Sequence, residues 1–562
     1  MNSMNSMGNA GNMGNMDNAS NAFSPGDFMH TVFWQEDQVV ITFHSSYTLT
    51  SMPPGGFKKD GAPIGTFPIT PTIISSLNLR DINAFLEGNG FSLSSFGDKD
   101  VLNPSSTLSG SEDLNSQKGK YLFRAPGDKG TTVIGFFNFK ALNGGQPGMA
   151  GSASGTMPSG MISTQEDGQT SEDSDDDGEQ PPKNRIGNVP RLVNLINQNL
   201  DKFGTETSQI IGATPNWYSG ATTQESPKPV GCPLTPPIPV PADKYSPHAA
   251  GLWPIKVPEL SHDPGLSHNM HSMTGDGVTV IILDTLPKAG DISRAVEGAE
   301  RKNLLLLDVA NNVTLNHNTL SFDLDTPSLA QPIAGKDIYG RIVGFHMPDH
   351  GLFAAGIIRD LAPDANVECV RVLNDYCVGN MAMLTKTLED IHIRMLPVKP
   401  DGQEGDLHNK PVVINLSMAI SPPDGDILNE GLDPTFIQNV RSSLLGPIQS
   451  LVDLGAVFAA SAGNESDPRN IAMNPQKLRF GPLYPAAFAY PPDNVEEMIP
   501  VGAVNKYGDA ASYSNYPGSR GIATYGGELP EAVKPVPPNC MTEATDLDAM
   551  IGLYTALYYP AL

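Results

Sequence analysis

Residues Gly275 to Thr285 read GDGVTVIILDT, a short apolar run that ends in an acidic residue. Every residue from Val278 to Leu283 is β-branched or aliphatic, which is typical of a strand buried on both faces of a parallel sheet. Asp284 follows at the point where this strand should end. Open α/β sheets place their ligands and chemistry at such strand ends, although a single acid there often only caps the next turn.

A second segment, PDHGLFAAGIIRDLAPDA (Pro348 to Ala365), has the pattern of a helix. Pro348 and Asp349 favour a helix start, and the residues after them repeat close to the helical period. The repeating apolar positions are Leu352, Phe353, Ile357 and Leu361. His350 is therefore predicted in the first turn of a helix whose small residues allow close approach to a sheet. A lone histidine at a helix start is usually structural, so this segment indicates a functional site only in combination with the other segments.

A third segment, GAVFAASAGNES (Gly455 to Ser466), predicts another buried strand that breaks into a loop of small residues. The strand covers Val457 to Ala460, and the loop leads to Asn464, whose side-chain amide can donate a hydrogen bond. If the strands are parallel neighbours, the acid, the imidazole and the carboxamide converge at one edge of a single sheet.

Together these segments resemble the subtilisin-like serine proteases, the subtilases. The aspartate of that family lies in a motif like VIILDT, its histidine in a motif like HGxxxAGII, and its oxyanion-hole asparagine in a motif like AASAGNE. The resemblance assigns these roles to Asp284, His350 and Asn464, in the chain order of the family. It covers Gly275 to Gly527 and implies an α/β fold in which helices flank a parallel sheet.

Two further segments are similar to the same family, PVVINLSMAI (Pro411 to Ile420) and IPVGAVNKYGDAASYSNYPG (Ile499 to Gly518). The resemblance places the substrate along the end of the first of them and along the loop before Asn464. The residues expected at the substrate are Leu416, Ser417 and Met418, which form one wall of the first specificity pocket, and Ser461, Ala462 and Gly463. The family usually continues the first segment with two glycines. Ala419 and Ile420 stand there instead, and we expect their side chains to narrow the groove for an extended substrate.

The residue types suit the hydrolysis of a peptide bond by a hydroxyl group. A neutral imidazole can take the hydroxyl proton near neutral pH, and a carboxylate fixes the imidazole tautomer. An oriented amide donor stabilises the oxyanion of the tetrahedral intermediate. The resemblance therefore implies a serine endopeptidase that acts on extended polypeptides.

The nucleophile of this chemistry is missing from the sequence. Subtilases carry it last, in a Gly-Thr-Ser motif that opens a buried helix, but no Gly-Thr-Ser occurs here and the last serine is Ser519. Cys540 lacks the small-residue helix start that a nucleophile needs. The apolar ending DAMIGLYTALYYPAL (Asp548 to Leu562) is that expected of a chain that stops before its last elements. The alternative is a truncated or inactive subtilase-like protein that at most binds peptides.

The sequence before this region divides into segments of different composition. Residues 1–27 are of low complexity, 28–145 predict a small α+β domain, 146–190 an acidic disordered linker, 191–260 a helix and a proline-rich connecting arm, and 261–562 the C-terminally incomplete peptidase domain. The small domain is expected to contain strands at Val39–Phe43, Lys120–Arg124 and Thr131–Lys140 and a helix at Leu77–Leu86, and a further helix is expected at Arg191–Phe203. By analogy with subtilase prodomains, the small domain inhibits the peptidase domain or assists its folding. An unrelated interaction module is the other interpretation.

The composition excludes several classes of function. The formal net charge of −26 argues against nucleic acid and anionic membranes as partners. No segment approaches the length of a membrane helix, and the N-terminus lacks the apolar core of a secretory signal, which favours the cytoplasm or an unrecognised export route.

We expect neither a metal site nor a required cofactor. The four cysteines lack metal-ligand spacing and are expected to be free thiols. Calcium stabilises many subtilases, but the sequence places no site for it. Asp173, Asp175, Asp177 and Gly178 match the start of a calcium loop whose twelfth position would be Asn184 rather than glutamate. Residues Asn311 to Arg341 are expected to be an insertion between the aspartate and the histidine.

Overall fold

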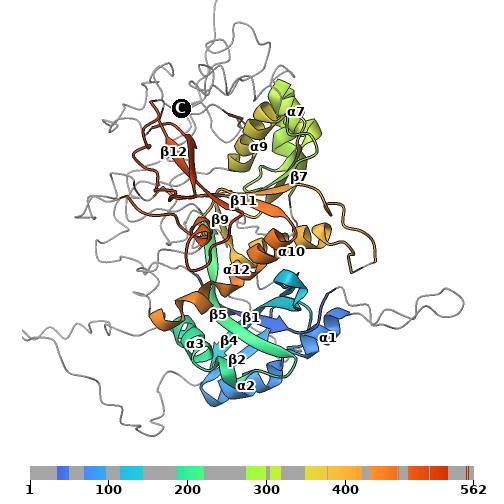
Figure 1. The fold of residues 1–562 in the computed structure, drawn as a ribbon, viewed down its shortest axis with the longest axis vertical. Helices are drawn as coiled ribbons and strands as arrows, with labels where there is room; N and C mark the ends of the chain where they lie inside the picture. Colours follow the sequence, from blue (N-terminus) through green and yellow to red (C-terminus); the bar gives the residue numbers. More distant parts are fainter. Residues whose placement is uncertain are drawn as a thin grey trace, which may run out of the picture.

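The computed structural model describes two sheets and the helices that cover them (Figure 1). The described residues are 34–49, 69–96, 114–142, 187–220, 274–298, 304–317, 348–375, 377–400, 402–420, 431–464, 466, 479–505, 507–528, 552–553 and 555. The acidic linker, the calcium-like segment, Cys232, Cys540 and most of the expected insertion lie outside these residues.

The first sheet is antiparallel and is built mainly from the N-terminal part of the chain. Its strands are β1 (Trp34–Ser45), β2 (Phe91–Ser95), β3 (Lys120–Arg124), β4 (Thr131–Ala141) and β5 (Ser208–Gly220). The order is β2-β4-β1-β5-β9, in which the last strand is the short β9 (Val378–Asn380), and β3 also pairs with β4. Helices α1 (Ile69–Ser75), α2 (Leu79–Gly88) and α3 (Asn188–Asn197) accompany it. The small α+β domain of the fold prediction is therefore present, and the structure adds β5, which the sequence analysis did not predict.

The second sheet is parallel throughout the described part of the chain. Its strands are β6 (Thr279–Asp284), β7 (Thr314–Asn316), β8 (Asn366–Arg371), β10 (Val412–Leu416), β11 (Ala456–Ser461), β12 (Met498–Val504) and β13 (Ile522–Tyr525). The order is β13-β12-β11-β10-β6-β8-β7, and each neighbouring pair is parallel. This seven-stranded sheet, flanked by helices, confirms the predicted α/β class.

Strand β6 is apolar on both faces because helices cover both sides of the sheet. Ile281 and Leu283 belong to the core that also contains residues of α10 (Met381–Met395) and α12 (Ile437–Asp453). Ile282 belongs to the core formed with α6 (Ala289–Gly298), α7 (Leu304–Asn312) and α9 (His350–Leu361). Each fully buried Ile or Leu side chain contributes about 1.5–3 kcal/mol, so this strand is anchored from both faces.

Helices α10 and α12 lie between the two sheets (Figure 1). One hydrophobic core runs from the antiparallel sheet through these helices to the parallel sheet. Two side chains of α10 also bond the backbone of β3: Glu389 accepts from the N–H of Leu122 at 2.6 Å, and His392 from that of Arg124 at 3.0 Å. These N–H groups at the edge of β3 are thus satisfied by side chains rather than by another strand.

The structure bears on the predicted state of two cysteines and on the length of the helices. Cys369 and Cys377 are both buried, and neither forms a disulfide, as expected. Burial, with the nearby charge of Asp284, raises the pKa of Cys369 well above its usual value, so it remains a neutral thiol. Across the described ranges, every helix is too short or too polar to cross a bilayer.

Candidate active site

Asp284 lies at the carboxyl end of β6 and is completely buried. Its Oδ1 accepts a hydrogen bond of 2.6 Å from the backbone N–H of Thr285. Because β6 has β10 on one side and β8 on the other, this carboxylate stands at the middle of the sheet edge. It therefore occupies the place where open α/β sheets carry their functional groups.

His350 is the first residue of α9, and its ring faces Asp284. Nδ1 of His350 lies 2.8 Å from both carboxylate oxygens of Asp284. The imidazole is 12% exposed, whereas the carboxylate is fully buried. A carboxylate on Nδ1 favours the tautomer with the proton on that atom, which leaves Nε2 as the atom able to accept a proton.

Gly351 allows the helix to approach the strand closely enough for this contact. A Cβ atom at Gly351 would overlap the carbonyl oxygen of Thr285 and lie 3.1 Å from Cβ of Asp284. The N–H of Gly351 points to the Thr285 hydroxyl at 3.3 Å. The sequence analysis expected small residues to permit this approach, and Gly351 is the residue that does so beside the histidine.

Asn464 lies three residues after β11, at the same edge of the sheet. It is half-buried. Strand β10 separates β11 from β6, so the two strand ends are about 10 Å apart at the usual spacing of neighbouring strands. The structure thus brings Asp284 and His350 into contact and places Asn464 on the same side of the sheet.

The loop that carries Asn464 is held by Asn515, which the sequence analysis did not single out. Oδ1 of Asn515 accepts from both the N–H and the hydroxyl of Ser466 at 2.9 Å, and its Nδ2 donates to the carbonyl of Ala462 at 3.1 Å. Its backbone N–H donates to the carbonyl of Gly463 at 2.9 Å. Asn515 is 1% exposed. No local pattern reveals this role, because the contacts join segments far apart in the sequence.

The residues expected along the substrate differ in exposure. Ser417, Ser461 and Gly463 are half-buried, whereas Leu416, Met418 and Ala462 are buried. Ala419 and Ile420 are also buried, and the N–H of Ile420 donates to the carbonyl of Tyr484 at 3.0 Å. Their side chains therefore belong to the core, as do those of Leu416 and Met418, and the narrowing of a substrate groove by Ala419 and Ile420 stays a prediction.

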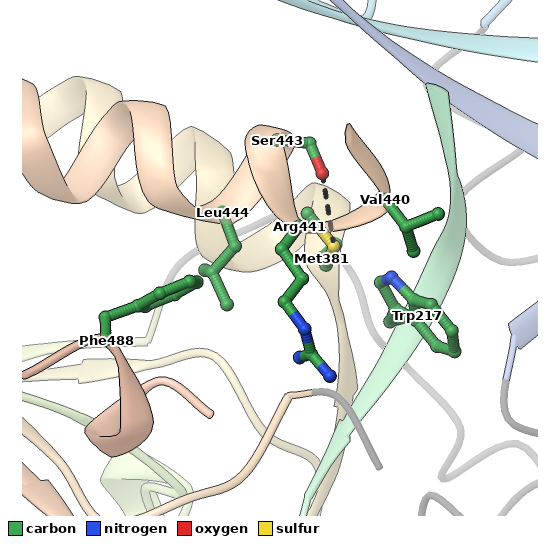
Figure 2. A pocket seen from close by; sticks show the side chains of 7 residues that line it. All are labelled: Trp217, Met381, Val440, Arg441, Ser443, Leu444 and Phe488. Carbon is green, nitrogen blue, oxygen red and sulfur yellow. Dashed lines mark hydrogen bonds between the residues drawn. The ribbon is translucent and has the colours of Figure 1, made fainter. Parts of the chain in front are cut away.

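A small pocket lies elsewhere, where β5 passes α10 and α12 (Figure 2). Its lining residues are Trp217, Met381, Val440, Arg441, Ser443, Leu444 and Phe488. The guanidinium of Arg441 lies 3.4 Å from the centre of the Tyr484 ring. This pocket shares no residue with the predicted site, and its mostly apolar lining makes it a packing gap between the two sheets.

The end of β5 pairs with a short strand that precedes α10. Residues 218–220 run antiparallel to β9 (Val378–Asn380), with Ser219 opposite Gly379. A Cβ atom at Gly379 would lie 2.5 Å from the carbonyl of Val372 and 2.7 Å from Oγ of Ser219. An extended segment of the N-terminal sheet is therefore bound along β9 by strand addition.

The C-terminal residues Gly552, Leu553 and Thr555 lie against α9, the helix of His350. Thr555 contacts Asp349 by both its N–H and its hydroxyl. The sequence analysis used Asp349 only as a helix-start signal and missed this contact. Within the described residues, no group of three or more His, Cys, Asp or Glu side chains could hold a metal ion.

The solved structures that match part of this chain include two proteases. One is a lanthipeptide protease, with 18% identity and a TM-score of 0.28 over 48% of this chain and 61% of that chain. The other is a cold adapted subtilisin-like serine proteinase, with 16% identity and a TM-score of 0.24 over 46% of this chain and 66% of that chain. The chain thus spans about three fifths to two thirds of the length of either structure. No family model matches the chain, and no curated protein matches it.

Proposed function

We propose that the parallel-sheet domain carries the site of a subtilisin-like serine endopeptidase that acts on extended polypeptides. His350 serves as general base and then general acid, Asp284 orients its ring, and Asn464 donates to the oxyanion. The carrying observation is the contact of His350 Nδ1 with both oxygens of a fully buried carboxylate at 2.8 Å. In subtilisin itself, loss of the asparagine that donates to the oxyanion lowers turnover by about 10²–10³.

The backbone around the site supports a polypeptide as the substrate. Leu416 and Ser461 are the last residues of the neighbouring parallel strands β10 and β11. Directly after them come Ser417 and Met418 on one side and Ala462 and Gly463 on the other. An extended peptide laid against these chain segments can form main-chain hydrogen bonds while its carbonyl group approaches Asn464. The function requires no metal or cofactor, because a base, an orienting carboxylate and an oxyanion donor suffice for acyl transfer to a hydroxyl.

A second candidate function is peptide binding without catalysis. It is favoured by the absence of a Gly-Thr-Ser motif from the sequence and by the segment of β5 that lies along β9. That segment shows how an extended chain is accommodated near α10. In this interpretation the N-terminal sheet is an intramolecular partner, a prodomain-like module whose last strand occupies a peptide-binding edge.

Labelling with a fluorophosphonate probe separates the two functions. The chain as given is expected to remain unlabelled, because the dyad has no serine in the expected motif to activate. The DNA downstream of the Leu562 codon should then be read and any longer product expressed. Labelling of that product, abolished by His350→Ala and by Asp284→Ala, supports the endopeptidase. Labelling that survives both substitutions contradicts the proposed roles, and a product that stays unlabelled favours peptide binding.

A further inference from the structure

The described C-terminal residues pack against α9, the helix that begins with His350. A Cβ atom added at Gly552 would overlap the Phe353 ring, and one added at Gly356 would lie 2.9 Å from the Leu553 side chain. Leu553 is buried in the core on this side of the sheet. Apolar packing on the body of the helix is therefore sufficient to attach this segment.

Asp349, the residue before His350, makes a different kind of contact with the same segment. Its Oδ1 accepts from the N–H of Thr555 at 3.1 Å and from the Thr555 hydroxyl at 2.7 Å. Both residues are 0% exposed. Burial of an ionised carboxylate is costly unless hydrogen bonds compensate it, and hydrogen bonds to an ionised group are roughly twice as strong as those between neutral groups. The pair is therefore a strong contact at a place that solvent does not reach.

The side chain of Asp349 makes this contact in place of a helix cap. An aspartate directly before a helix ordinarily accepts from an N–H group of the first turn, but the side chain of Asp349 makes no such bond. Its carbonyl oxygen accepts from the N–H of Phe353 at 2.8 Å. Asp349 is thus joined to α9 by its backbone and to Thr555 by its side chain, so it couples the position of the helix start to that of the C-terminal segment.

The first turn of α9 is held on each side of His350 in the sequence. After it, the N–H of Gly351 lies 3.3 Å from the hydroxyl of Thr285 at the end of β6. Before it, the side chain of Asp349 is bound to the C-terminal segment. Between these two contacts, Nδ1 of His350 lies 2.8 Å from both oxygens of Asp284. A misplacement of about 1 Å in a catalytic group can cost about 10²-fold in rate, so the position of this turn matters for chemistry.

We infer that Asp349 is a positioning residue for the base: by binding Thr555 it fixes the first turn of α9 and holds His350 against Asp284. An anchor is needed at this end, because helix ends fray and the first N–H groups of a helix have no partner within it. Packing of Leu553 farther along the helix does not supply that anchor. The inference rests on the proposed function, in which His350 is the base, and deepens it by giving the C-terminal segment a part in keeping the dyad assembled.

Matched substitutions of Thr555 test the inference in the full-length chain. Thr555→Val keeps the shape of the side chain and removes the hydroxyl, whereas Thr555→Ser keeps the hydroxyl. The readout is the nuclear magnetic resonance signal of the His350 Nδ1 proton in protein with ¹⁵N-labelled histidine, identified by its loss in His350→Gln. Its exchange with water should accelerate about 10- to 100-fold in T555V, the range expected when one hydrogen bond to a charged group is lost. Exchange in T555S should stay close to that of the wild type.

Substitutions of Asp349 test the other partner of the contact. Asp349→Ala removes both hydrogen bonds to Thr555 and should accelerate the exchange of the His350 proton more than T555V does. Asp349→Asn keeps an oxygen acceptor and should retain most of the protection. Asp364→Ala, which removes an exposed aspartate beyond the other end of α9, is the matched control and should leave the exchange unchanged. Each variant is measured well below its thermal midpoint, so that global unfolding does not contribute to exchange.

The outcomes separate this inference from the proposed function. A merely structural contact would lower the thermal midpoints of T555V and D349A while the His350 proton exchanged as slowly as in D364A, and that result would overturn the inference with the dyad intact. An equally protected proton in Asp284→Asn would overturn the proposed role of Asp284, and the inference with it. Faster exchange in T555V and D349A, with T555S and D349N near the wild type, supports the inference.

Discussion

Gly351 and Thr285 lie so close together that a Cβ atom on Gly351 would overlap the Thr285 carbonyl oxygen. This contact joins the first turn of α9 to the end of β6. It sets the distance between the two elements that carry the imidazole and the carboxylate. The geometry of the dyad therefore depends on a residue that takes no part in the chemistry.

Gly351→Ala should push α9 away from β6 and lower the stability of the parallel-sheet domain. Overpacking of a tight contact costs about 1–3 kcal/mol. The urea midpoint should fall accordingly, and the nuclear magnetic resonance signals of the His350 ring should shift. The control is Gly290→Ala in α6, where an added Cβ atom meets nothing within 4 Å. Equal midpoints for the two variants would show that the close contact is dispensable.

Asn515→Ala should loosen the loop that carries Asn464. The substitution removes three side-chain hydrogen bonds and leaves the buried N–H of Ser466 without this acceptor. An unsatisfied buried polar group costs about 1–3 kcal/mol. Hydrogen exchange at Ser466 should accelerate, and the urea midpoint should fall.

Asn505→Ala is the comparison for that loop. Asn505 accepts from Tyr507 and Asp509 within one exposed turn, so its loss should cost less than about 1 kcal/mol. If N515A and N505A were equally stable and Ser466 stayed protected in both, Asn515 would have no special role in the loop.

Glu389→Gln should stabilise the protein above neutral pH. Burial raises the pKa of Glu389 to about 7, from an unfolded value near 4.5. The contribution of protonated Glu389 to the free energy of unfolding is therefore fully present below pH 4.5 and is lost as the pH rises through 7. A glutamine side chain cannot ionise, so E389Q should gain up to about 3 kcal/mol over the wild type between about pH 4.5 and 8. Chemical denaturation across this range measures it, with Asp390→Asn on the same helix as the exposed control. A constant difference at every pH would contradict the linkage.

His392→Gln should reduce the loss of protein stability that occurs at acid pH. Burial lowers the pKa of His392 to about 3, and the charge of Arg124 adds to this effect. Neutral imidazole accepts from the N–H of Arg124, and a protonated ring cannot. The wild type should therefore lose about 2 kcal/mol relative to H392Q between about pH 6.5 and 5. His408→Gln, at a histidine whose Nδ1 lies 2.8 Å from the exposed carboxylate of Glu404, is the control. Parallel stability curves for wild type and H392Q in this range would argue against the prediction.

Local patterns were sufficient for the elements that carry the dyad. The apolar run ending at Asp284 forms β6, and the segment beginning near His350 forms α9. Both predictions succeed because a continuous apolar run and a helical repeat are each visible within a few neighbouring positions of the sequence. The helix also shows the limit of such patterns. Leu361 continues the apolar repeat but is 40% exposed, because the buried face is formed by Leu352, Ala355 and Gly356.

Contacts between distant segments could not be predicted in this way. The pairing of β5 with β9 and the bonds of Glu389 and His392 to β3 join elements that the sequence places in separate domains. An edge strand whose N–H groups are hydrogen-bonded by side chains has no sequence signature. Any carboxylate or imidazole that lies beside such an N–H group can accept its hydrogen bond.

The amino-acid sequence by itself determined the type of sheet, its central strand and the identities of an acid, an imidazole and a carboxamide at strand and helix ends. Only the tertiary structure decided that Asp284 and His350 touch, that Asn515 holds the loop of Asn464, and that Thr555 is held by Asp349. The sequence is sufficient for the first group of features because the spacing of apolar residues is a property of short segments. Hydrogen bonds across the sheet edge depend instead on how closely two packed elements approach, and a single glycine against a carbonyl oxygen sets that approach here.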